Sequence, residues 1–162
     1  GGEIRVESVP DRGSAFPICL PAAGKPVAAP PEPLPEITFA ARVLVIDDEE
    51  DVLETLKEIL VSAGHIVSAA RSGEAGVAAF RQGEFDLVLS DLGMPGMSGW
   101  DVAREIRELN PRVPVVIVTG WGEQVDSELL RRSGVVRTVG KPVEMKGLLR
   151  IVSEVLRGRT GR

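Results

Sequence analysis

The chain has 162 residues, enough for one ordinary domain and an appendage, and its 43% hydrophobic and 27% charged residues are typical of a folded globular protein. The formal net charge of −5, without any Lys/Arg cluster interleaved with aromatic residues, argues against a nucleic-acid surface. No apolar run approaches the roughly 20 residues that span a membrane, and the single Cys19 excludes a disulfide framework and favours the reducing cytosol.

The N-terminal part predicts a β-hairpin and then a linker. Residues 4–9 alternate apolar and polar side chains, a turn-forming "PDRGS" follows, and residues 15–20 are apolar, which is typical of a hairpin. Pro17 favours an edge position for the second strand. A two-stranded hairpin alone is marginal in water, and the chain begins at Gly1 without a signal peptide, so we expect a piece of a longer protein. The stretch 22–36 is rich in Pro and Ala and predicts an extended linker.

After the linker, apolar strands alternate with amphipathic helices. Continuous runs such as "RVLVI" indicate strands buried on both faces, and Leu53, Leu56 and Leu60 follow helical spacing. Gly64 is a candidate helix C-cap. The predicted strands are 42–46, 65–70, 85–90, 113–119 and 135–139, and the predicted helices are 49–63, 73–82, 99–109, 122–132 and 143–157. This alternation predicts an α/β fold, a doubly wound five-stranded parallel sheet with helices on both faces.

Polar residues stand where these strands end. Each has an ordinary explanation by itself, because acids favour helix starts and Asp favours turns. In a parallel sheet, however, the carboxyl ends of the strands share one crevice. Three carboxylates crowded there need a compensating cation, and oxygen ligands suit Mg²⁺. A hydroxyl and an ammonium beside them suit phosphoryl transfer to a carboxylate. The residues concerned are Asp47, Asp48, Asp91, Thr119 and Lys141.

Small residues around the central carboxylate suggest room for a ligand. The loop after Asp91 contains Gly93, Gly96 and Gly99, and its backbone can offer a carbonyl oxygen to a metal ion. Gly120 follows Thr119 directly and leaves that approach open as well. The only histidine is His65, at the start of a predicted strand, which excludes a multi-histidine metal site and favours a structural role.

The segments "VLVIDDEE", "DLVLSDLGMPGMSG", "VVIVTG" and "GKPV", in this order, closely resemble the receiver domain of two-component response regulators. The resemblance implies a flavodoxin-like strand order, 2-1-3-4-5, and a phosphoryl group accepted by Asp91 from a phosphohistidine on a kinase or histidine phosphotransfer domain. It implies Mg²⁺ held by Asp47, Asp48, Asp91 and the Gly93 carbonyl. It further implies that Thr119 and Lys141 contact the phosphoryl group, that the receiver catalyses its own phosphorylation and dephosphorylation, and that the Lys141-Pro142 bond is cis.

One departure concerns how the signal is read out. Receivers usually carry Tyr or Phe three residues before the lysine, whereas this chain has Thr138 there and no tyrosine at all. Phosphorylation should survive this change, but the usual aromatic readout is in doubt. Trp121 is either a substitute gate beside the site or a surface aromatic residue.

The first 21 residues resemble the final hairpin of a histidine-kinase ATP-binding domain. The resemblance lies in the Gly-Gly-x-Ile strand, the Gly-Ser turn and the Phe-x-Ile-x-Leu-Pro strand. It implies the C-terminal fragment of a hybrid sensor histidine kinase, in which the fragment itself neither binds ATP nor contacts the membrane. Its output would be contacts with other proteins, with dimerisation through the receiver surface or the hairpin as one form. The expected parts are a remnant hairpin 1–21, a linker 22–40, a receiver 41–157 and a tail 158–162.

Two other functions fit parts of the pattern. A phosphatase of the haloacid dehalogenase type also uses Asp, Thr, Lys and Mg²⁺ on a doubly wound sheet. Its nucleophile, however, ends the first strand in an Asp-x-Asp pattern, where this chain has Asp47-Asp48-Glu49. The third hypothesis is a docking domain that keeps the fold without being phosphorylated, which the complete set of polar strand-end residues disfavours.

Overall fold

The structure is a computed structural model that describes residues 2–9, 13–20, 40–120, 130 and 132–160. The chain divides into two compact units, residues 1–33 and 34–162. None of the helices in the described part of the chain has the length and apolar content that crossing a membrane requires.

The first unit contains one antiparallel hairpin made of four short strands, β1 (Glu3–Ile4), β2 (Glu7–Val9), β3 (Gly13–Ala15) and β4 (Ile18–Cys19). Strand β1 pairs with β4 and β2 with β3, and both pairs follow the same register. The interruption falls at Pro17, which has no N–H to donate to the ladder, while its carbonyl accepts from the Arg5 amide at 3.0 Å. The predicted hairpin is confirmed, with each long strand broken in two.

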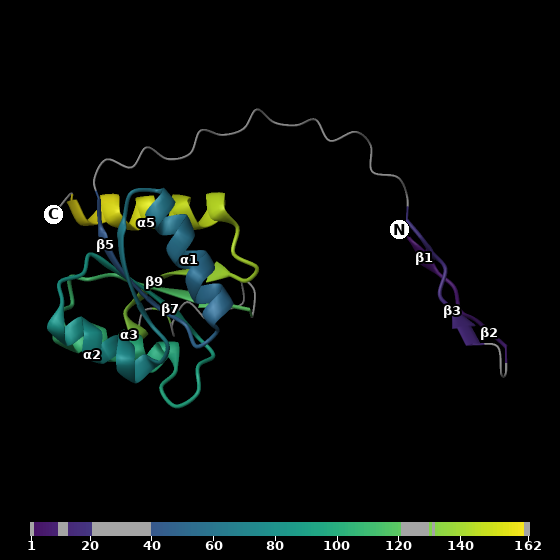
Figure 1. Ribbon diagram of the computed structural model, residues 1–162, viewed down its shortest axis with the longest axis horizontal. Helices are drawn as coiled ribbons and strands as arrows, with labels where there is room; N and C mark the ends of the chain where they lie inside the picture. The colour runs from purple at the N-terminus through teal and green to yellow at the C-terminus, as the bar shows by residue number, and fades with distance from the viewer. Residues whose placement is uncertain (1, 10–12, 21–39, 121–129, 131, 161–162) are drawn as a thin grey trace. The chain divides into compact units, whose positions relative to one another are not determined.

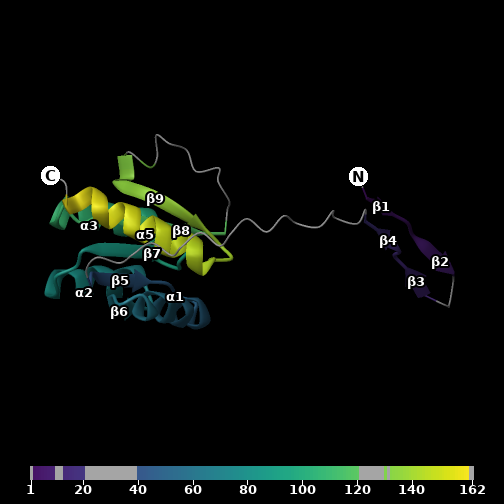
Figure 2. The ribbon, with the colours of Figure 1, turned by 90° about the horizontal axis from the view of Figure 1, so that it is seen from above.

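The second unit is a five-stranded parallel sheet in the order β6-β5-β7-β8-β9. Figures 1 and 2 show this sheet with helices on both sides. The strands are β5 (Arg42–Ile46), β6 (Ile66–Ala70), β7 (Leu87–Asp91), β8 (Val115–Thr119) and β9 (Val135–Gly140). The helices are α1 (Glu50–Ser62), α2 (Gly73–Gln82), α3 (Gly99–Leu109) and α5 (Met145–Thr160). The predicted doubly wound fold and its strand order, 2-1-3-4-5, are confirmed, whereas the helix predicted at 122–132 lies almost entirely outside the described residues.

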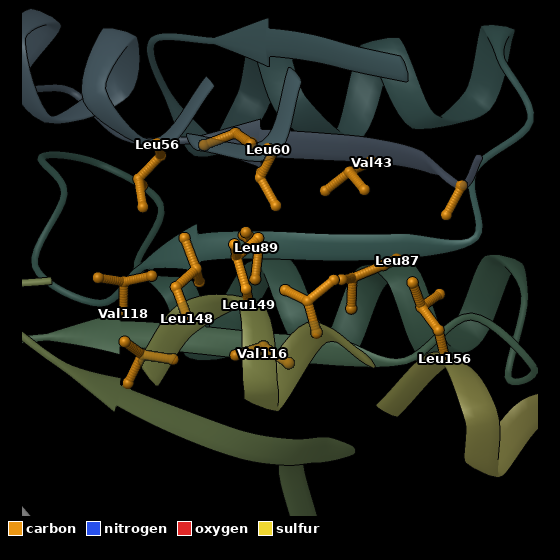
Figure 3. Packing of buried hydrophobic residues seen from close by; sticks show 14 of the residues in the cluster. Val43, Leu56, Leu60, Leu87, Leu89, Val116, Val118, Leu148, Leu149 and Leu156 are labelled. Carbon is orange, nitrogen blue, oxygen red and sulfur yellow. The ribbon is translucent and has the colours of Figure 1, made fainter. Parts of the chain in front are cut away.

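Alternate residues of each central strand feed two separate cores. Helices α1 and α5 cover one face, where Leu56 and Leu148 belong to the same core cluster as Leu89 (Figure 3). Helices α2 and α3 cover the other face, where Phe80 and Ile106 belong to the same cluster as Ile46, Val88 and Ile117. All five residues of β7 and all five of β8 are buried. Continuous apolar strands are therefore explained by burial on both faces.

Helix ends follow local chemistry at two positions. Helix α1 ends where Gly64 adopts φ +84°, and the amides of Gly64 and His65 donate to the carbonyls of Val61 and Leu60. This is the Schellman arrangement predicted by the glycine. Helix α3 begins with a reciprocal capping box, in which Ser98 accepts from the Asp101 amide and Asp101 accepts from the Ser98 amide.

Candidate functional site

The carboxyl ends of the central strands bring the predicted polar residues to one edge of the sheet. Asp47 follows β5 directly, Asp91 is the last residue of β7 and Thr119 is the last residue of β8. The neighbouring strands pair in parallel, with Ile46 opposite Ser90 and Asp91 opposite Val118. Strand order reverses beside β5, because β6 lies on one side of it and β7 on the other. Open α/β sheets bind their ligands at such a switch point.

Lys141 joins two of the three carboxylates in this crevice. Its Nζ lies 2.7 Å from Oδ1 of Asp91 and 3.2 Å from Oδ2 of Asp47. The lysine follows β9, and its backbone amide donates to the Thr119 carbonyl at 2.7 Å. That bond ties the start of the lysine loop to the end of β8. The Lys141-Pro142 bond is cis, as the resemblance implied.

The two carboxylates favour the protonated form of Lys141. Burial alone would lower the pKa of Lys141, but the adjacent carboxylates of Asp91 and Asp47 outweigh it and raise that pKa. Burial raises the pKa of Asp47, against the lowering by the Glu49 amide and by Lys141. A lysine this firmly protonated is a fixed positive charge beside Asp91, which suits it to bind anionic oxygens.

Backbone contacts fix the Asp91 carboxylate from the other side. Its Oδ2 accepts a hydrogen bond of 2.6 Å from the Gly93 amide. Gly99 packs so closely on Asp91 that an added Cβ would collide with the Asp91 carbonyl oxygen. Gly96 has φ +78°, a left-handed conformation that favours glycine. At Gly93, by contrast, an added Cβ would make only an ordinary contact, 3.6 Å from Asp91 Oδ2, so steric room does not explain that glycine.

The oxygen donors fit Mg²⁺ in kind. Asp47 is fully buried, and its Oδ2 accepts no directed hydrogen bond from the described residues, although Lys141 Nζ lies 3.2 Å away. Such an oxygen is a ligand of the type that Mg²⁺ takes. Asp48 is exposed beside it. In the described ranges, no three acidic, His or Cys side chains already form a group able to hold a metal ion. Lys141 instead bridges Asp47 and Asp91 through its Nζ.

The comparisons with known proteins agree with this geometry. Residues 43–153 match the family described as the response regulator receiver domain. This chain belongs to that family. The receiver is therefore a module of two-component signal transduction, and family membership disfavours the phosphatase of the haloacid dehalogenase type.

Relatives cover either the receiver alone or nearly the whole chain. PilH of Pseudomonas aeruginosa is 35% identical over 120 residues, which are 73% of this chain and 99% of PilH. The sensor kinase CckA of Brucella abortus is 32% identical over 168 residues, which span 96% of this chain but only 18% of CckA. The crystal structure of the response regulator TrrA from Thermotoga maritima, in complex with Mg(2+)-BeF, has 31% identity and a TM-score of 0.66, covering 71% of this chain and 98% of TrrA.

Thr119 and Thr138 lie in the strands where the sequence pattern predicts them, whereas one contact of the site was missed. Thr119 is buried at the end of β8, and Thr138 lies in β9 opposite Ile117. Trp121 is outside the described residues. Glu49 was read only as part of an acidic helix start, yet its Oε1 lies 3.2 Å from Lys141 Nζ. No spacing rule reveals this pair, because the two residues are 92 positions apart.

Proposed function

We propose that this receiver accepts a phosphoryl group on Asp91 from a phosphohistidine of a partner kinase or histidine phosphotransfer domain. The observation that carries the proposal is the contact between the Asp91 carboxylate and the Lys141 ammonium, 2.7 Å apart at the sheet switch point. A carboxylate held between a backbone amide and a fixed cation is ready to receive an anionic group.

The transfer uses groups of this site, the phosphohistidine donor and a bound Mg²⁺. An oxygen of the Asp91 carboxylate attacks phosphorus, the new O–P bond forms as the N–P bond breaks, and the imidazole leaves with its electron pair. Lys141 and the Thr119 hydroxyl offer hydrogen bonds to the phosphoryl oxygens. Asp47, Asp48, Asp91 and the Gly93 carbonyl would hold Mg²⁺, which supplies neutralisation of the charge on the phosphoryl oxygens. Attack of water on the same phosphorus later returns the free carboxylate.

The test is the mass of the intact protein after incubation with acetyl phosphate, with and without Mg²⁺, beside an Asp91→Asn variant. We expect the gain of one phosphoryl group in the wild type, dependent on Mg²⁺ and lost in Asp91→Asn. An Asp91→Asn protein that labels as well as wild type would refute the assignment of Asp91. No gain combined with no Mg²⁺ binding would favour the docking-domain hypothesis.

We further propose that the chain is the C-terminal fragment of a hybrid histidine kinase, with residues 1–21 as the last hairpin of the ATP-binding domain. Two observations support this context. The similarity to the sensor kinase CckA extends over 96% of the chain and so includes the hairpin region. The hairpin also exposes Ile4, Phe16 and Ile18 by more than 60% each, as expected of a strand pair that lacks its covering layer.

The remaining parts of the proposal concern partners and place. Residues 22–40 would link the hairpin to a receiver of residues 41–157, with a tail of 158–162. The output would be protein–protein, as a relay to a histidine phosphotransfer protein or feedback onto the kinase, and dimerisation through the receiver surface or hairpin is one form of it. We propose a cytosolic location for these residues on the basis of the single Cys19.

A further inference from the structure

Glu49 directs its carboxylate away from the helix that it begins. It is the N-cap residue of α1, with an extended backbone of φ −83° and ψ 110°, yet its side chain caps no helix amide. A side-chain oxygen at this position ordinarily accepts from the first turn of the helix. Here the Oε1 atom lies 3.2 Å from Nζ of Lys141 instead. The side chain therefore serves the strand-end site rather than the helix.

Three carboxylates thus share one ammonium, and they are not equivalent. The side chains of Asp47 and Asp91 are 0% and 9% exposed, whereas that of Glu49 is 66% exposed. The two buried carboxylates are also anchored by backbone amides, Asp47 Oδ1 by Glu49 at 2.9 Å and Asp91 Oδ2 by Gly93 at 2.6 Å. An exposed ion pair of a long side chain is weak and easily given up. Glu49 is the member of the trio that can leave.

We propose that Glu49 is a positioning residue that pairs with Lys141 in the resting site and competes with phosphoryl oxygens for its ammonium. This inference rests on the proposed phosphoacceptor function. A phosphoryl group on Asp91 brings anionic oxygens to the same Nζ, and like charges at this distance repel. The buried carboxylates of Asp47 and Asp91 stay in place because backbone amides hold them. Glu49 therefore gives up its contact with Lys141. The resting contact then sets how readily an anion captures Lys141.

The test compares Glu49→Gln with Glu50→Gln in the full chain, by calorimetric titration of beryllium fluoride at saturating Mg²⁺. Both variants remove one charge from neighbouring exposed residues, but Glu50 pairs with Arg71 at 2.9 Å instead of Lys141. We expect Glu49→Gln to bind this phosphoryl mimic about two- to fivefold more tightly than wild type, the range of a weak exposed ion pair. Glu50→Gln should bind like wild type.

Each alternative result decides a different question. If the wild type binds beryllium fluoride and Glu49→Gln binds it equally or more weakly, the proposed role of Glu49 is wrong. The phosphoacceptor proposal is then unaffected. If none of the three proteins binds beryllium fluoride in the presence of Mg²⁺, the phosphoacceptor proposal is wrong. The proposed competition between Glu49 and phosphoryl oxygens then fails as well. A separate titration with Mg²⁺ alone should change equally in both variants; a loss confined to Glu49→Gln would show that the residue acts toward the metal ion and refute the proposal.

Discussion

The hairpin and the receiver sheet contain similar strand residues in opposite surroundings. Ile18 of β4 is 65% exposed and Ile4 opposite it is 64% exposed, whereas Leu89 of β7 and Ile117 of β8 are fully buried. All described strand residues of the hairpin are exposed. The receiver strands lie between two helical layers (Figure 1), and the hairpin unit contributes no layer of its own within residues 2–9 and 13–20.

The difference teaches that an apolar strand is stabilised by what covers it. Burial of a large apolar side chain contributes about 1.5–3 kcal/mol, and an exposed strand pair collects little of this. The receiver therefore carries its own hydrophobic cores, whereas the described residues of the hairpin bury none of their strand residues. Four experiments can break or sharpen this comparison.

Truncation of one apolar side chain in each region should give the largest contrast. Leu89→Ala leaves a cavity in a core with no exposure, so we expect a loss of about 2–5 kcal/mol in the free energy of unfolding. Ile18→Ala should change it by less than about 0.5 kcal/mol in this chain. Urea unfolding followed by circular dichroism measures both.

The same Ile18→Ala change tests the kinase context in a longer chain that includes the preceding residues. If the hairpin completes an ATP-binding domain there, the substitution should lower the free energy of unfolding of that domain. The decrease should be as large as that for truncating a buried aliphatic side chain. A longer chain that tolerates Ile18→Ala as well as the fragment does would contradict the proposed hairpin role.

A serine in each region gives the intermediate contrast. Ser98 forms the capping box of α3, so Ser98→Ala should lower the free energy of unfolding by about 1 kcal/mol. Ser14 makes only an exposed hydroxyl pair with Ser8 at 2.8 Å, and Ser14→Ala is its matched control, with no measurable change expected. Equal effects of the two substitutions would mean that the capping box does not stabilise the receiver.

Mild acid should give the smallest contrast, and only in the receiver, which contains the single histidine. Burial lowers the pKa of His65 below its ordinary 6.5, and its Nδ1 accepts from the Ala41 amide at 3.2 Å. The unfolded chain binds the proton more readily, so this contribution to stability is complete above pH 6.5 and is lost as the pH falls toward the folded pKa. His65→Gln should show a shallower loss of urea stability between pH 7.5 and 5; an identical slope would exclude His65 as its source.

The spacing of apolar residues and the positions of Gly and Pro were enough to predict most of the fold. The strand 42–46 and the helices 73–82 and 99–109 coincide with the observed elements. Gly64 marked the end of α1 correctly, because its positive φ has a local cause. The hairpin was predicted as two long strands, whereas the missing N–H of Pro17 divides the observed ladder.

The candidate site could be predicted only as a set of strand ends. Topology placed Asp47, Asp91 and Thr119 at one edge, since parallel strands end together. The contact of Lys141 with both carboxylates depends on side-chain directions between elements far apart in the sequence. So does the contact of Glu49 with the same ammonium, from 92 positions away. Adjacency in the sequence is not a reliable guide either. Asp48 directly follows the buried Asp47, yet it is exposed.

The unbroken register of the hairpin has a consequence for how this chain behaves in solution. Ile4 lies opposite Ile18, so these two apolar side chains share one face, while Glu3 and Glu7 occupy the other. Within the described residues no third strand pairs with this ribbon. A two-stranded ribbon with an exposed apolar face and unpaired strand edges can associate with strands of other chains. We therefore expect the colloidal stability of this chain to be limited by its first 20 residues, and the receiver to set its free energy of unfolding.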